Sequence, residues 1–154
     1  MSVQKKGLEI IQSKKGLIVN TIGLDGYPNT RIFYSQANDG YTVYFSSGAQ
    51  AAKVAEIAAN PKVNAYYEDT SQELQTWKSV VIYGNAEPLE KDSAEYKKAV
   101  ELISAKNANF KKRAEEGQLT GNTLFKIKPF RAKVLDFAQE PRTTEFEIDE
   151  KVDW

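Results

Sequence analysis

Apolar and β-branched residues gather in seven short segments of the chain, and turn-forming residues separate these segments. Side chains of a β-strand point to opposite faces in alternation, so such segments predict strands that are buried on one face or on both. The sequences Asp25-Gly26 and Asn38-Asp39-Gly40 are typical of hairpin turns between strands. The expected strands are residues 17–24, 30–36, 41–46, 63–68, 79–87, 124–127 and 130–137.

Four other segments show the helical period, in which apolar residues recur every three or four positions. Asp92 or Ser93 supplies an N-cap for one of them, and Gly16 and Gly117 end two others. The final segment, 138–154, is an acidic tail with little periodicity, and we expect its acidic run, 145–153, to be solvated. The expected helices are residues 3–13, 49–59, 93–105 and 108–116.

Short strands joined mostly by hairpins indicate a mostly β fold with peripheral helices. We expect a six- to seven-stranded antiparallel sheet that closes, or nearly closes, into a barrel with helices at its rim. Residues 80–83 and 124–127 are apolar on both strand faces, so helices or a second copy of the chain must cover the outside. The 154 residues are expected to form one domain, 1–154, that includes the acidic tail.

The composition excludes several kinds of site. The sequence contains no Cys and no His, so one chain cannot build a disulfide framework, a thiolate or imidazole metal centre, or a Ser-His-Asp triad. Lys plus Arg and Asp plus Glu both total 21, and zero net charge disfavours non-specific nucleic-acid binding. The apolar runs are far shorter than the roughly 20 residues of a membrane span, and no signal peptide is visible, so we expect a cytoplasmic protein without a membrane partner.

Cations and hydroxyl groups converge at the start of one expected helix. Arg31 lies in the second expected strand, Ser46 and Ser47 end the third, and Lys53 lies in the helix that follows. Arg offers a rigid fork to two phosphate oxygens, Lys adds a mobile charge, and backbone N–H groups at a helix N-terminus attract anions. The sequence therefore predicts a cradle for a phosphate ester, although Arg31 and Lys53 could instead be solvated or salt-bridged.

The order of these motifs resembles the pyridoxamine 5′-phosphate oxidase-like FMN-binding split barrels, over about residues 5–137. Residues 124–129, Leu-Phe-Lys-Ile-Lys-Pro, are similar to the general stress protein branch of that family. The residues that carry the resemblance are Gly26, Pro28 and Arg31; Phe45-Ser46-Ser47; Lys53; Asn60-Pro61-Lys62-Val63; and residues 80–87.

The resemblance implies an FMN cofactor, with a deazaflavin as the alternative. Arg31 and Lys53 match the family positions that contact the flavin phosphate. Ser46 and Ser47 match positions that hydrogen-bond the phosphate or the ribityl chain. No metal is expected, and no catalytic residue is assigned.

The same resemblance implies where the flavin ring lies. Ile32, Phe33 and Tyr34 match a strand whose backbone lines the isoalloxazine ring, and Ser79 matches a position beside it. The resemblance also implies a two-fold dimer in which the flavin lies between the subunits. We therefore expect a homodimer with its flavin sites at the interface.

One departure from the family concerns the substrate. True pyridoxamine phosphate oxidases hold their vitamin substrate with a C-terminal segment that contains arginine and histidine. This chain has no His, and its residues 139–154 are acidic. We therefore do not expect it to oxidise pyridoxamine phosphate.

Three functions remain open at this stage. The first is a flavin-dependent oxidoreductase that acts on small-molecule electron donors and acceptors. The second is a non-catalytic module that binds FMN or another small ligand in stress or redox physiology. The third is a barrel that binds single-stranded nucleic acid through aromatic side chains, which the zero net charge disfavours.

Overall fold

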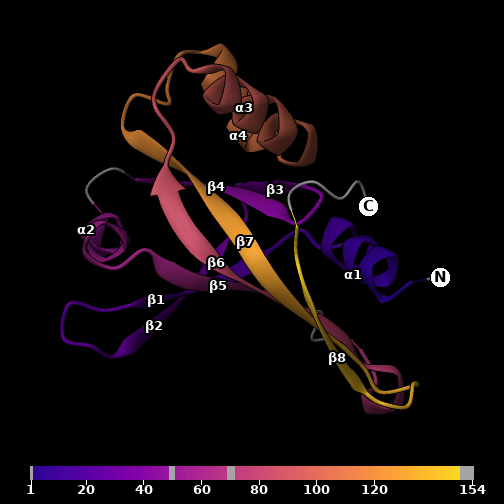
Figure 1. Ribbon diagram of the computed structural model, residues 1–154. Helices are drawn as coiled ribbons and strands as arrows, with labels where there is room; N and C mark the ends of the chain where they lie inside the picture. Colours follow the sequence, from indigo (N-terminus) through magenta and orange to yellow (C-terminus); the bar gives the residue numbers. More distant parts are fainter. Residues whose placement is uncertain (1, 49–50, 69–71, 150–154) are drawn as a thin grey trace.

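The computed structural model describes residues 2–48, 51–68 and 72–149. Its eight strands form one antiparallel sheet that curls into a half-barrel (Figure 1), which confirms the expected split-barrel class with peripheral helices. The strands are β1 Leu17–Ile22, β2 Pro28–Phe33, β3 Gln36–Asp39, β4 Thr42–Gly48, β5 Lys62–Tyr67, β6 Lys78–Pro88, β7 Asn122–Asp136 and β8 Thr143–Glu147. The helices are α1 Val3–Gln12, α2 Ala52–Ala59, α3 Ala94–Lys106 and α4 Ala108–Glu115, with a short 3-10 turn η1 at Leu74–Thr76.

Residues 28–39 connect the two ends of the curled sheet. The strand order is β2-β1-β5-β6-β7-β4-β3, so β2 and β3 lie at opposite ends although only Tyr34 and Ser35 separate them. The Ser35 carbonyl accepts a 3.0 Å hydrogen bond from the backbone N–H of Ser46 in β4. The prediction of one strand over 30–36 is therefore wrong, because the chain pairs first with β1 and then, after a bend, with β4. The predicted turn at 38–40 is confirmed between β3 and β4, with Gly40 at a φ of 58°.

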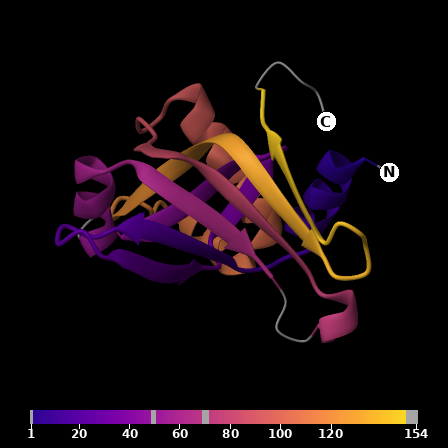
Figure 2. The same ribbon diagram turned by 60° about the horizontal axis from the view of Figure 1, so that its bottom comes forward.

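Alternate side chains of the strands form the main core inside the curl. Leu17, Val19 and Phe33 belong to this core, whereas Ile18 and Ile32, their neighbours in sequence, lie on the other face of the sheet. Figure 2 shows the curvature that encloses the core. Helices α1 and α2 add to it the apolar side chains of Leu8, Ile10, Ile11 and Ile57.

A second core lies outside the curl, beneath α3 and α4. Figure 1 shows these two helices side by side over one end of the sheet. Tyr44 and Leu124 contribute from β4 and β7, and Ala99, Ile103 and Phe110 contribute from the helices. The helices therefore cover part of the outward apolar surface that the sequence predicted. Within the described residues, no helix is long and apolar enough to cross a membrane.

β7 is one continuous strand where the sequence predicted two. Pro129 has no N–H to donate to a sheet, and the predicted break fell on it. The structure accommodates Pro129 at an irregularity, because the register with β6 shifts between Tyr83 and Gly84, and Gly84 lies opposite Pro129. A Cβ atom on Gly84 would lie 2.3 Å from the Lys128 carbonyl oxygen, so glycine permits this close approach of the two strands.

The segment after β7 contains β8, a strand at residues 143–147 that the sequence analysis did not predict. β8 pairs with the second half of β7, and Phe146 packs its ring 5.5 Å from that of Tyr41. Lys133 and Glu145 face each other across the two strands at 3.5 Å. The single apolar side chain and the cross-strand ion pair gave too weak a periodicity to be recognised as a strand. Residues 150–154 of the predicted tail lie outside the described residues.

Candidate functional site

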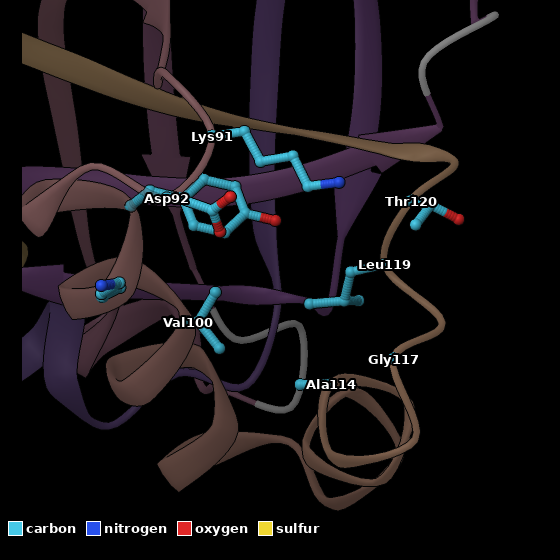
Figure 3. Close-up of a pocket in the computed structure, with 9 residues that line it drawn as sticks. Lys91, Asp92, Val100, Ala114, Gly117, Leu119 and Thr120 are labelled. Carbon is cyan, nitrogen blue, oxygen red and sulfur yellow. The ribbon is translucent and has the colours of Figure 1, made fainter.

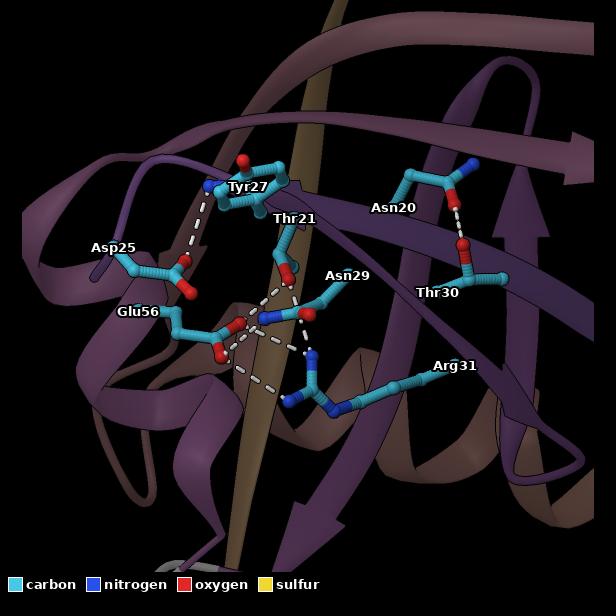
Figure 4. A network of polar contacts seen from close by, with 8 residues as sticks. All are labelled: Asn20, Thr21, Asp25, Tyr27, Asn29, Thr30, Arg31 and Glu56. Carbon is cyan, nitrogen blue, oxygen red and sulfur yellow. Dashed lines mark hydrogen bonds and ion pairs between the residues drawn. The ribbon is translucent and has the colours of Figure 1, made fainter. Parts of the chain in front are cut away.

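Arg31 is held in a polar network that joins β1, β2 and α2 (Figure 4). Its Nη1 and Nη2 atoms donate to the two carboxylate oxygens of Glu56, at 3.0 and 3.2 Å. The Thr21 hydroxyl and the Asn29 amide donate to the same carboxylate, at 2.7 and 2.8 Å. The Arg31 Nη1 also donates to the Thr21 hydroxyl oxygen at 3.1 Å. Four donors therefore surround one carboxylate, which fixes the guanidinium group against α2.

This ion pair is more buried than an ordinary surface salt bridge, so breaking it would leave a poorly solvated charge. The Glu56 side chain is 8% exposed and the Arg31 side chain is 26% exposed. The hydrogen bonds from Arg31 and Thr21 hold the pKa of Glu56 below its ordinary value, despite the opposing effect of burial. Glu56 is therefore ionised at neutral pH and neutralises the charge of Arg31 at close range.

Lys53 brings a second cation close to Arg31. Its Nζ lies 4.9 Å from the centre of the Phe33 ring, and the side chain is half-buried on α2. Burial lowers the pKa of Lys53, and the charge of Arg31 lowers it further, whereas Glu56 raises it. Phe33, whose backbone the sequence placed along a flavin ring, thus packs its own ring in the core beneath this lysine.

Helix α2 has Lys53 in its first turn and begins without a side-chain cap. Its N-cap residue is Ala51, whose methyl group cannot accept a hydrogen bond from the first turn. Backbone N–H groups at such an end favour an anion through hydrogen bonds and the helix dipole. Ala49 and Gln50, with which the expected helix 49–59 begins, lie outside the described residues.

Ser46 and Ser47 are both buried at the end of β4, and their side chains already have partners. The Ser46 hydroxyl accepts a 2.8 Å hydrogen bond from the Asn122 amide on β7. The Ser47 hydroxyl donates to the carbonyl of Gly48 at 3.2 Å. Ser47 lies five residues before the first residue of α2, whereas Ser46 belongs to the opposite face of the strand. Of the two, Ser47 shares its strand face with Phe45, which packs on Phe33 at 4.6 Å.

The outer face of β2 borders a cavity of about 400 Å³. Ile32 and Tyr34 line it and are 55% and 61% exposed. Tyr66 on β5 forms another wall, and the buried Ser79 lies beside the Tyr66 hydroxyl. Of the predicted ring-lining residues, Ile32 and Tyr34 thus line this cavity, whereas Ser79 adjoins it only through Tyr66.

The cation pair and the outer cavity meet at β2. Arg31 and Ile32 are consecutive, so they point to opposite faces of this strand. β2 pairs with β1 alone along its length and is the end strand of the sheet order. An elongated ligand that crosses this free edge can therefore contact both faces, with an anionic group near Lys53 and an aromatic group near Tyr34.

Another cavity, of about 410 Å³, lies between α3 and the loop after α4 (Figure 3). Val100 and Leu119 form apolar walls on its two sides, and Lys91, Asp92 and Thr120 lie at its rim. None of the residues that the sequence predicted as a site lines this cavity.

Sequence reasoning missed Glu56, Thr21 and Asn29. Glu56 follows Lys53 by one helical turn, a spacing that usually marks a pair of exposed side chains on a helix surface. Its real partner, Arg31, is 25 residues away along the chain. The sequence offered one signal that Glu56 could be buried: it directly precedes the core residue Ile57, in a helix with few polar side chains.

Comparison with known protein families agrees with this fold. The family model described as pyridoxamine 5′-phosphate oxidase matches residues 3–136. The chain belongs to this family, which confirms the resemblance seen in the sequence. No curated protein matches the chain.

Several solved structures share the fold. One is a protein from Clostridium acetobutylicum related to general stress protein 26 of B. subtilis, with 18% identity and a TM-score of 0.71 over 96% of this chain and 95% of that one. A heme-binding protein from Mycobacterium smegmatis has 14% identity and a TM-score of 0.79 over 96% of this chain, which spans only 58% of its length. HutZ, the heme storage protein of Vibrio cholerae, has 19% identity and a TM-score of 0.68 over 84% of this chain and 91% of that one. At these identities the likeness establishes the fold and leaves the ligand open.

The buried carboxylate predicts a large effect of Arg31 on stability. Arg31→Ala leaves Glu56 without its counter-charge, so the free energy of unfolding should fall by about 3 kcal/mol. Urea denaturation followed by circular dichroism measures this difference. Arg31→Ala combined with Glu56→Gln should recover most of the loss, because no buried charge then remains unpaired. A fall below about 0.5 kcal/mol for the single variant, as at an ordinary surface site, would contradict the burial argument.

Proposed function

We propose that this protein binds FMN and acts as a flavin-dependent oxidoreductase. One observation carries the proposal: Lys53, in the first turn of the uncapped helix α2, lies near Arg31, although their charges repel. Only one of these two charges has a carboxylate partner among the described contacts, so an anion is favoured beside Lys53. A phosphate monoester carries between one and two negative charges at neutral pH and accepts several hydrogen bonds.

The residues present fit this cofactor in two parts. Lys53 and the first N–H groups of α2 hold the phosphate, with Arg31 and Ser47 close by. Ile32 and Tyr34 line the cavity proposed for the isoalloxazine ring, and Ser79 lies behind its Tyr66 wall. The ring of Phe33 packs in the core on the other face of the same strand. FMN supplies the electron and hydride chemistry when bound, and the protein binds, orients and shields it.

The electron donor and the substrate are small molecules, and pyridoxamine phosphate is not proposed as one of them. The chain has no His to hold that substrate, as noted above. A non-catalytic FMN- or deazaflavin-binding module is the alternative, since the same phosphate and ring contacts serve either use. Anaerobic reduction by NADPH or NADH, followed by reoxidation, distinguishes a turning-over enzyme from such a module.

Heme is a weaker candidate, although several structures with this fold carry heme-related names. Proteins hold heme iron most often through His, Cys or Met side chains. The sequence has no His, no Cys and a single Met at position 1, which leaves tyrosine as the remaining common ligand. The charges of Lys53 and Arg31 suit a phosphate at least as well as a heme propionate. The lack of His and Cys as axial ligands of heme iron therefore favours the flavin.

We also place the flavin between two copies of the chain. Ile32 and Tyr34 are large and exposed, and they lie next to Ile18 and Tyr66 around the outer cavity. A monomer seldom leaves such a cluster open to water. A two-fold dimer would cover it and would supply two equivalent sites, each with residues from both chains.

The phosphate contact predicts how Lys53 affects affinity. Lys53→Met keeps an unbranched apolar side chain over Phe33 but removes the charge, so the FMN dissociation constant should rise at least roughly tenfold. Riboflavin lacks the phosphate, and its affinity should change little. Quenching of flavin fluorescence during titration measures both constants.

Lys112→Met, an exposed change on α4, serves as the matched control and should leave both affinities unchanged. Equal FMN affinity in the wild type and the Lys53→Met variant would overturn the assignment of the phosphate site.

The exposed cluster predicts the state of assembly. Sedimentation equilibrium of the FMN-loaded protein should give twice the 17.3 kDa mass of the chain, with two FMN per dimer. Ile32→Lys places a charge in the interface, so it should shift the equilibrium towards monomers and weaken FMN binding in parallel. A monomer that keeps its flavin would refute the shared site.

A further inference from the structure

We propose that Gln36 and Asn107 are positioning residues, which hold two walls of the outer cavity together and thereby set its affinity for a flat ring such as isoalloxazine. This inference rests on the proposed function, because it concerns the cavity that is proposed for the flavin ring. Neither side chain lines that cavity of about 400 Å³. Both act through backbone carbonyl groups of residues that do line it.

The first wall is the loop between α1 and β1, and Gln36 holds it. Gln36 is the first residue of β3 and is fully buried. Its Nε2 donates to the carbonyl oxygens of Lys14 and Lys15, at 3.2 and 3.1 Å, so both hydrogens of this nitrogen are used. Lys106, the last residue of α3, also donates to the Lys14 carbonyl, at 3.0 Å. The backbone of this loop is therefore fixed from β3 and from α3.

The other end of the Gln36 amide is unsatisfied. Its Oε1 is buried and has no hydrogen-bond partner within the described residues. A buried oxygen without a partner normally destabilises a fold. An apolar side chain of similar size would avoid that loss, but it could not fix two carbonyl groups. The NH2 group, which faces the loop, is therefore the part of this side chain that serves the structure.

The second wall is Tyr34, at the bend between β2 and β3, and Asn107 holds its backbone. The Asn107 Nδ2 donates to the Tyr34 carbonyl at 3.1 Å. The Oδ1 of the same amide accepts a 2.9 Å hydrogen bond from the Phe110 N–H, as the N-cap of α4. One side chain thus joins the start of α4 to the bend that carries Tyr34.

The two walls meet at Gly16. A Cβ atom on Gly16 would lie 3.2 Å from Cε1 of Tyr34 and 3.6 Å from Cδ1 of Ile32, so the loop packs directly against these two side chains. A shift of either wall therefore changes the space beside the other. A ligand that needs both walls in place binds more weakly as the fraction of molecules in that arrangement falls.

The experiment measures riboflavin and FMN affinities of two variants and of the wild type. Asn107→Asp keeps an oxygen that caps α4 but places a carboxylate, which cannot donate, against the Tyr34 carbonyl. Gln36→Met keeps a side chain of similar length but removes both donors to the loop. Each variant should raise both dissociation constants by the same factor, roughly fivefold, because the ring is common to the two ligands.

A second readout separates positioning from stability. The visible circular dichroism of bound riboflavin, measured at saturation, depends on how the protein holds the ring, so it should change in both variants. A loss of stability alone would alter neither this spectrum nor the affinity of the folded protein. Asn109→Asp adds the same charge at an exposed position on α4, and it should leave both dissociation constants and the spectrum unchanged.

Unchanged riboflavin affinity in Asn107→Asp, with its far-ultraviolet spectrum intact, would overturn the inference while the proposed function stands. A loss confined to FMN would do the same, because it would belong to the phosphate site at Lys53. Asn107→Asp decides the question even if Gln36→Met fails to fold. Wild-type protein that binds neither flavin would refute the proposed function, and this inference would fail with it.

Discussion

The Glu56 carboxylate connects the end strand of the sheet to the helix beside it, and the geometry of the candidate site depends on that connection. Glu56 receives donors from β1 and β2 while its own helix inserts Ile57 into the core. An ionised carboxylate in this position requires a cation, which is Arg31. The ion pair of Arg31 with Glu56 thereby ties β2 to α2, the helix that carries Lys53. The proposed anion site would thus be built on a scaffold that already contains a balanced ion pair.

The regular parts of this fold could be predicted from the sequence because they depend on local patterns. The period-two segments in β1, β4, β5 and β6, the cap at Ser93 and the turn at Gly40 all follow from short-range chemistry. Features that depend on distant partners could not be predicted. Pro129 is tolerated inside β7 because Gly84 faces it, and β8 forms because β7 offers a free edge.

The candidate site divides in the same way. Arg31 and Lys53 were recognisable from their motifs, and the structure brings them together. The ion pair of Arg31 with Glu56 was not recognisable, because a carboxylate one turn from a lysine normally indicates two exposed side chains on a helix surface. Ser46 binds Asn122 on the face opposite to Phe45, so its place at the phosphate stays a prediction. A sequence motif shows which strand or helix a residue belongs to. The face of the sheet on which its side chain lies depends on the strand register.

The family fixes the fold, and proteins with this fold include both stress-related and heme-related structures at under 20% identity. The ligand therefore has to be argued from the side chains of this chain. A crystal structure of the protein with FMN tests the central claim most directly. Our account predicts a phosphate oxygen within hydrogen-bond distance of the Lys53 Nζ, with Arg31 still paired to Glu56. A phosphate bound by the full Arg31 fork, with the ion pair to Glu56 broken, would contradict it.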